Sequence, residues 1–118
     1  MDLEMELRLP QDAEVKVAFS LTAQVKVTDV TAQRKVSKLL LDKVGNLLYG
    51  ERPSLVVGVR LLWRVPVWLG LPDVGPVGQI GALDVDAQTG EILFTRQILD
   101  DIAERGDALA QRITSATR

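Results

Sequence analysis

The feature that most constrains the fold is a long run, Leu55 to Leu71, in which every second residue is apolar. Successive side chains of a β-strand point to opposite faces, so this period of two places the apolar residues on one face of a sheet. A single strand of this length is unusual, which favours a bend, a bulge or two joined strands near Gly58–Leu62. Pro66 cannot donate a backbone hydrogen bond, so we expect it at a sheet edge or a bulge.

Two further runs near the N-terminus alternate in the same way. Residues 3–9 place apolar side chains on one face and charged side chains on the other, and alternation resumes over residues 15–27. Pro10, Gln11 and Asp12, which lie between the runs, are typical turn residues. Two alternating runs around a short turn predict a β-hairpin.

Two segments change to the helical period. The first begins near Val30, where the side chain of Asp29 or Thr31 can cap the first turn. Its predicted apolar stripe is Val36, Leu40, Val44 and Leu47. The second helix follows a possible cap at Thr95, and Gly106 weakens it by roughly 1 kcal/mol relative to alanine. Its predicted stripe is Ile98, Ile102, Leu109 and Ile113.

The segment between the long alternating run and the last helix contains many glycines and prolines. Their density over residues 70–81 predicts a loop. Residues 80–85 and 91–94 are strand-like, and Asp86–Gly90 between them has the composition of a tight hairpin turn. Gly90 suits a left-handed backbone position in that turn.

These elements predict one α+β domain over residues 1–118, in the order β-β-α-β-β-β-α. Short connections dominate, so we expect a largely antiparallel sheet of about five strands. The two amphipathic helices should pack on one face of that sheet.

Composition excludes several classes of site. The chain has no cysteine and no histidine, which removes disulfides, thiolate metal sites and the commonest general base. We therefore expect no catalytic residues, no metal and no cofactor. The formal net charge of −2 gives no global attraction to nucleic acid or to anionic lipid. The start of the chain is acidic, and Arg60, Arg64 and Pro66 interrupt the most apolar stretch, so we expect a cytoplasmic protein without a membrane span.

The long alternating run contains the strongest candidate interface. Trp63 shares the apolar parity and should face the core, whereas Trp68 has the opposite parity and should lie beside Arg60 and Arg64. Tryptophan and arginine are enriched at interface hot spots. Because this surface exceeds what one sheet face absorbs, we expect a homodimer or another small homo-oligomer.

Three weaker candidates need a structural test. Arg34, Lys35 and Lys38 make the first helix locally basic, which suits either phosphates or an acidic partner on the one hand, or a solvated outer face on the other. The Gly/Pro segment 70–81 could bind a small ligand or contribute to an enzyme site. The alternating oxygens of Asp84 and Asp86 faintly resemble a calcium loop, but the ligands that such a loop needs further on are missing.

Two motifs carry a family resemblance. Trp63-Arg64-Val65-Pro66-Val67, followed by Asp84-Val85-Asp86-Ala87-Gln88-Thr89-Gly90-Glu91-Ile92-Leu93, resembles the C-terminal half of PepSY-type domains over roughly residues 60–94. Those domains carry a tryptophan-containing strand and a hairpin turn of this composition. The resemblance implies a small, non-enzymatic α+β module with inhibitory or binding roles, and it transfers no active-site residue.

The sequence therefore predicts a non-catalytic protein-interaction or regulatory module. One alternative is an antitoxin-type regulator that neutralises a partner protein or contacts DNA through the first helix. Another is a small-ligand binder or an enzyme that uses residues 70–81.

Overall fold

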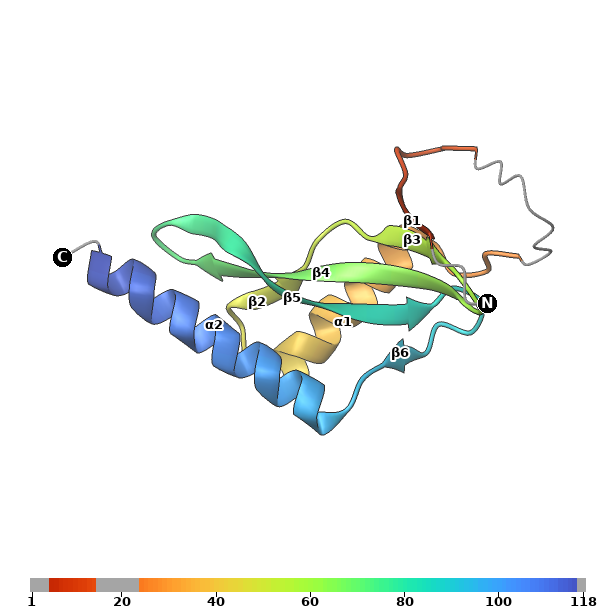
Figure 1. The fold of residues 1–118 in the computed structure, drawn as a ribbon. Coiled ribbons are helices and arrows are strands. Elements are labelled where there is room, and N and C mark those ends of the chain that lie inside the picture. The colour runs from red at the N-terminus through yellow and green to blue at the C-terminus, as the bar shows by residue number, and fades with distance from the viewer. Residues whose placement is uncertain (1–4, 15–23, 117–118) are drawn as a thin grey trace.

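The structure is a computed structural model that describes residues 5–14 and 24–116 of the chain. Within these residues the fold is α+β, with two helices and an antiparallel sheet (Figure 1). The elements are β1 (Met5–Arg8), α1 (Asp29–Lys43), β2 (Leu48–Gly50), β3 (Ser54–Val57), β4 (Leu61–Leu71), β5 (Gly75–Asp86), β6 (Ile92–Leu93) and α2 (Arg96–Ala116).

The sheet is organised around the long strand β4. Its order is β1-β3-β4-β5-β6, and β2 also pairs with β4, beyond the end of β3. Every pairing is antiparallel, which confirms the predicted sheet type. The β4–β5 hairpin forms the longest ladder and provides the floor on which both helices pack.

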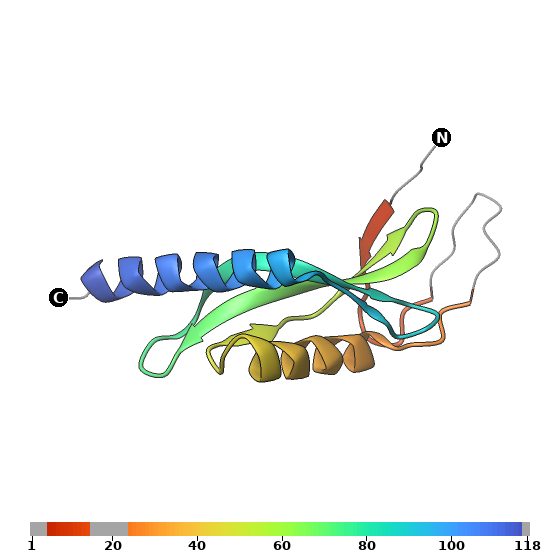
Figure 2. The same ribbon diagram turned by 90° about the horizontal axis from the view of Figure 1, so that it is seen from below.

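Both helices lie on one face of the sheet, as the sequence predicts (Figure 1 and Figure 2). The helical side chains that are buried against the sheet are Ala32, Val36 and Leu40 from α1, and Leu99 and Ile102 from α2. They join one cluster with the odd-numbered residues of β4, which are Leu61, Trp63, Val65, Val67 and Leu69. Burial of this apolar surface is the main stabilising contribution to the fold.

The caps of the helices explain where each one begins. Thr28 caps α1, because its Oγ1 atom accepts a hydrogen bond from the backbone N–H of Thr31 at 3.1 Å. The sequence predicted Asp29 or Thr31 as the cap of α1, and both lie after Thr28 in the chain. At α2 the predicted cap is confirmed, since Thr95 Oγ1 accepts from the N–H of Ile98 at 3.2 Å.

Gly106 allows α2 to approach the sheet closely. A Cβ atom there would lie 3.2 Å from Leu48 Cδ2 and 3.3 Å from Ile80 Cδ1. The glycine lowers helix propensity, but a side chain at this position would push α2 away from β2 and β5.

The long alternating run divides into two strands, β3 and β4, around a turn near Gly58–Arg60, which is one of the three predicted alternatives. Pro66 lies inside β4. Strands β3 and β2 pair with the same edge of β4, and Pro66 lies at the gap between them. In an antiparallel ladder the N–H and C=O of a residue point to the same neighbour. The carbonyl of Pro66 accepts from Glu51 N at 2.8 Å, so the missing N–H faces the connection between β2 and β3.

Only part of the predicted N-terminal hairpin lies within the described residues. Strand β1 is present, but it pairs with β3, with Leu7 opposite Leu55. Residues 15–23 of the predicted second strand lie outside the described residues, and residues 24–27 form no strand. The alternating pattern identified β1 correctly but did not predict its pairing with β3.

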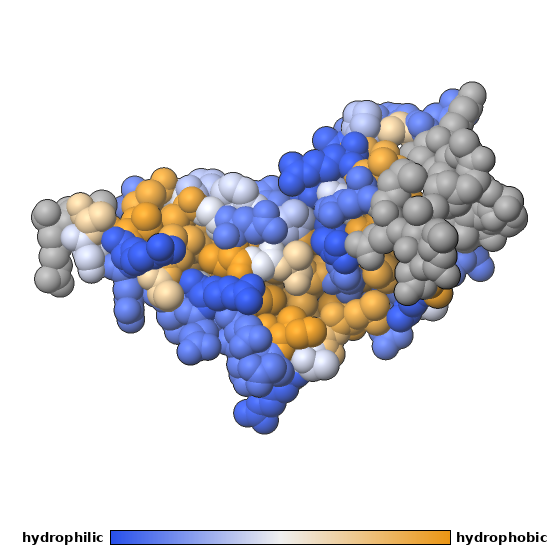
Figure 3. Space-filling model, in the orientation of Figure 1, coloured by the Kyte–Doolittle hydropathy of each residue, from blue (hydrophilic) through white to orange (hydrophobic). Residues whose placement is uncertain are grey.

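The predicted loop over residues 70–81 is wrong. Leu71 ends β4 and Gly75 begins β5, so only three residues connect them. This hairpin end projects beyond α1 and lies along the C-terminal part of α2 (Figure 1 and Figure 2). Apolar residues gather there on the molecular surface (Figure 3), and Val74 at the tip is 55% exposed.

Candidate functional site

The sheet face opposite the helices carries two of the three predicted interface residues. Arg64 and Trp68 occupy even positions of β4, together with Leu62 and Pro66, and no helix of the described chain covers this face (Figure 1). Leu62, Arg64 and Trp68 are half-buried, and Pro66 is buried. The parity prediction for the two tryptophans is therefore confirmed, since Trp63 is only 5% exposed.

Arg64 is held in an ion-pair network on this face. Its Nε atom lies 2.9 Å from Asp84 Oδ1 and its Nη2 atom 3.1 Å from Asp84 Oδ2. Its Nη1 atom also lies 3.7 Å from Glu6 Oε2. Bidentate geometry fixes the guanidinium plane. Arg64 thus contributes a neutralised polar region instead of a free positive charge.

Apolar and aromatic residues adjoin this network toward the hairpin end. We call Tyr49, Pro66, Trp68 and Ala82 the aromatic platform. Tyr49 is directly opposite Trp68, and Pro66 is directly opposite Ala82. A Cβ atom at Gly70 would lie 3.1 Å from Tyr49 Cε1, so the tyrosine ring packs closely over the backbone there. Partial burial, together with Glu51, raises the pKa of Tyr49, so its hydroxyl stays protonated.

Arg60 lies away from the aromatic platform and stabilises the turn after β5. Its guanidinium pairs with Asp86, whose side chain is 8% exposed. Asp86 Oδ1 also accepts from the backbone N–H groups of Gln88 at 2.8 Å and Thr89 at 2.9 Å. The hydrogen bond from Arg60, followed by the one from Thr89, lowers the pKa of Asp86 from 3.8 to about 2.

These contacts bear on the calcium-loop alternative. The Asp86 carboxylate is surrounded by hydrogen-bond donors, whereas a cation site needs converging oxygen ligands. Gly90 adopts the predicted left-handed conformation, with φ of +81°, and closes the turn. The geometry of Asp86–Gly90 is that of a structural turn.

The predicted basic helix face is exposed on α1. Arg34 and Lys38 lie one turn apart and are open to solvent. Lys35 is also exposed, but its Nζ atom donates to the carbonyl oxygen of Gly90 at 2.7 Å. At least one of the three positive charges therefore has a structural role, tying α1 to the β5–β6 turn.

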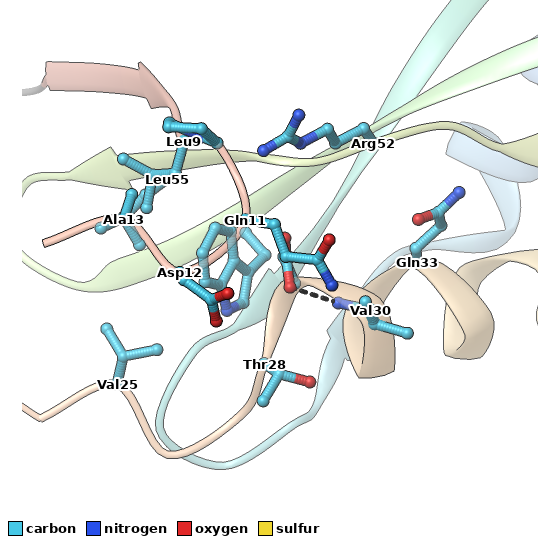
Figure 4. Close-up of a pocket in the computed structure, with 13 residues that line it drawn as sticks. Leu9, Gln11, Asp12, Ala13, Val25, Thr28, Val30, Gln33, Arg52 and Leu55 are labelled. Atoms are coloured by element: carbon cyan, nitrogen blue, oxygen red, sulfur yellow. Dashed lines mark hydrogen bonds between the residues drawn. The ribbon is translucent and has the colours of Figure 1, made fainter.

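A pocket that the sequence did not reveal lies at the N-terminal end of α1 (Figure 4). Its volume is about 770 Å³, within the usual range for ligand sites. The lining residues come from four separate segments: Leu9, Pro10, Gln11, Asp12, Ala13, Val25, Thr28, Asp29, Val30, Gln33, Arg52, Leu55 and Trp63. No local motif connects these segments, so no sequence pattern marks the site.

The pocket has an apolar wall and a polar rim. Leu55 and Trp63 are almost completely buried, and the indole N–H of Trp63 donates to the carbonyl of Val27 at 2.6 Å. Figure 4 shows Leu9 and Leu55 on one side of the pocket and Thr28 on another, with the charged ends of Asp12 and Arg52 well apart. The site combines an apolar surface with charges of both signs.

Among residues 5–14 and 24–116, no group of three or more acidic side chains is placed to hold a metal ion. No helix in the same part of the chain is long and apolar enough to cross a bilayer. Comparisons of the sequence with protein-family models, with curated proteins and of the structure with solved structures gave no match. The PepSY resemblance therefore stays a prediction that rests on the quoted residues.

Proposed function

We propose that the protein is a non-catalytic interaction module that binds a second copy of itself through the aromatic platform. The observation that carries the proposal is the position of Tyr49 and Trp68, side by side on a sheet face that no described helix covers. Aromatic side chains of this kind bury a large area at low entropic cost and dominate many interfaces. The resemblance to PepSY domains implies an inhibitory or binding role and supports the same class of function.

The charges around the platform favour self-association. Arg64 is already paired with Asp84, so that pair brings no unpaired cation to the interface, and Glu6, whose side chain is 48% exposed, keeps its charge in solvent. A two-fold interface brings the same patch of each copy together, and a face without a strong net charge permits that arrangement. The ion-pair network would then lie at the rim.

The test is the mass of the protein in solution. Light scattering at tens of micromolar should give about twice 12.9 kDa for the wild type. Trp68→Glu should return the mass to that of the monomer, because it places a charge in the centre of the interface. Circular dichroism should stay nearly unchanged, since Trp68 is only half-buried.

Leu41→Glu is the matched control. Leu41 is 60% exposed on α1, so the same apolar-to-acidic change there should leave the mass doubled. A wild-type mass near 12.9 kDa would reject self-association. A Trp68→Glu chain that unfolds would show instead that Trp68 is part of the core.

A further inference from the structure

The hydrogen bonds at the start of α1 determine which charge the pocket can accept. An unoccupied helix N-terminus attracts anions through its free N–H groups. Here Asp29 Oδ1 accepts from Val30 N at 2.8 Å, and Thr28 accepts from Thr31 N through its side chain and from Ala32 N through its carbonyl. These first-turn donors are occupied within the chain, so the helix end offers them to no anionic ligand.

The carboxylates on the rim favour a cationic group instead. Asp12 and Asp29 both line the pocket, against the single guanidinium of Arg52. Asp12 has φ of +61°, at the third position of a turn in which Ala13 N donates to Pro10 O at 3.2 Å. Aspartate tolerates this left-handed conformation, which holds its carboxylate at the opening. No hydrogen bond or ion pair ties up Asp12 or Arg52 within the described part of the chain.

A simple cation would leave the apolar part of the pocket unfilled. Leu9, Val25 and Val30 expose apolar surface beside the nearly buried Leu55 and Trp63, and a volume of about 770 Å³ accommodates an aliphatic or aromatic side chain. The Trp63 indole N–H is already satisfied, and the 5% of the residue that stays exposed adds only a narrow apolar edge to the pocket. An occupant that satisfies both wall and rim has an apolar group next to a positive charge.

We propose that this pocket binds an extended peptide segment in which an apolar side chain adjoins a basic one. The apolar side chain packs against Leu9, Val25 and Val30, next to Trp63, and the basic side chain pairs with Asp12. Arg52 lies apart from Asp12 and donates to backbone carbonyl oxygens of the peptide. This site is independent of the aromatic platform, because no platform residue lines the pocket.

Three acetylated and amidated tetrapeptides test the proposal: Lys-Leu-Phe-Lys, Glu-Leu-Phe-Glu and Lys-Ser-Ser-Lys. Amide chemical shifts of the wild-type protein should move around the pocket with the first peptide, with a Kd on the order of 100 μM, as weak side-chain contacts imply. In a Trp68→Phe variant Trp63 is the only tryptophan, so its fluorescence reports directly on the apolar wall. Both observables should respond much more weakly to the other two peptides.

Asp12→Asn tests the charge without disturbing the turn, because asparagine also tolerates the left-handed conformation. We expect it to weaken binding of Lys-Leu-Phe-Lys about threefold, the usual size of an exposed ion pair. Asp100→Asn, on the exposed side of α2, is the matched control and should leave the affinity unchanged.

Three results would overturn the proposal. The first is the absence of shifts with any peptide at low-millimolar concentration. The second is equal binding of the acidic and basic peptides, which would remove the role of Asp12. The third is a set of shifts centred on Trp68 and Tyr49, which would place the peptide on the platform. Failure of self-association in the light-scattering experiment has no bearing on these outcomes.

Discussion

Two left-handed glycines flank strand β5, one at its first residue and one in the turn that follows it, and their surroundings differ. Gly75 has φ of +85° and Gly90 has φ of +81°, so the backbone makes the same demand at both positions. A Cβ atom at Gly75 would meet nothing within 4 Å. At Gly90 it would lie 2.9 Å from Lys35 Nζ and 3.4 Å from Val27 Cγ2. Substitutions at Gly75 and Gly90 can therefore distinguish the cost of placing a side chain at positive φ from the cost of displacing neighbouring atoms.

The turn at Gly90 is tied to three other parts of the chain. Ala87 donates its N–H to Leu61 O, and its carbonyl accepts from both Lys26 N and Val27 N at 2.9 Å. Lys35 reaches the turn from α1, and Arg60 reaches it from the β3–β4 connection. This end of β5 joins the sheet to α1, and we call it the anchored end. The other end, around Gly75, we call the hairpin end.

The largest expected effect is that of Gly90→Val compared with Gly75→Val. A β-branched residue at positive φ costs on the order of 1–3 kcal/mol, and both variants incur that strain. Only Gly90→Val also disturbs the contact with Lys35, so we expect it to lower the free energy of unfolding by about 1 kcal/mol more, the typical worth of one hydrogen bond. Urea unfolding of both variants measures the difference.

Asparagine at the same two positions provides the control. Asparagine tolerates positive φ, so Gly75→Asn should be nearly neutral while Gly90→Asn still displaces Lys35. Equal losses for the two valine variants, together with equal losses for the two asparagine variants, would show that the neighbours of Gly90 contribute nothing.

A smaller effect is expected from Asp86→Asn at the anchored end. The amide keeps an oxygen for Gln88 N and Thr89 N but loses the charge that pairs with Arg60. We expect a loss of about 2 kcal/mol in the free energy of unfolding, the range for a partly buried charged hydrogen bond. Asp73→Asn, in the exposed turn of the hairpin end, should change stability by less than about 0.5 kcal/mol. Thermal unfolding of the two variants would contradict the comparison if the two losses were similar.

The pH dependence isolates the same carboxylate. The folded-state pKa of Asp86, about 2, lies below its ordinary value of 3.8, so ionised Asp86 stabilises the fold above pH 3.8. That contribution is lost as the pH falls from 3.8 toward 2. Since Arg60 is half exposed, we expect it to amount to about 1–2 kcal/mol. Urea midpoints of the wild type should therefore fall more steeply than those of Asp86→Asn between these pH values. Parallel curves would exclude Asp86 as the group responsible.

Local sequence patterns predicted the individual strands and turns of this fold better than they predicted which strands pair. The period of two in β4 and the turn at Gly90 follow from residues that are adjacent in the chain, and both predictions are confirmed. The pairing of β1 with β3 joins segments far apart in the sequence. Closing a longer loop adds little entropic cost, so proximity in sequence is a weak guide to strand pairing.

The Gly/Pro segment misled the prediction for a different reason. Glycine density suggested a loop, but a Cβ at Gly81 would lie 3.3 Å from Ile102 Cγ1 on α2. The absence of a side chain at Gly81 lets α2 pack closely on β5. This role depends on a tertiary contact, so the local sequence does not show it. The pocket at the start of α1 was missed on similar grounds, since its walls are assembled from segments that share no motif.

The smallest expected effect is that of Gly78→Val at the hairpin end. Gly78 lies in β5 and is not among the left-handed glycines of the described residues, so valine imposes no backbone strain. A Cβ atom there would lie 3.8 Å from Leu109 Cδ2, an ordinary van der Waals distance. Valine favours strands and reduces the entropy of the unfolded chain, and these gains offset the adjustment that Leu109 has to make. We therefore expect the free energy of unfolding to change by less than about 0.5 kcal/mol. Urea midpoints measured beside those of Gly90→Val decide the matter. A loss as large as that of Gly90→Val would show that the hairpin end is packed as tightly against α2 as the anchored end is against α1.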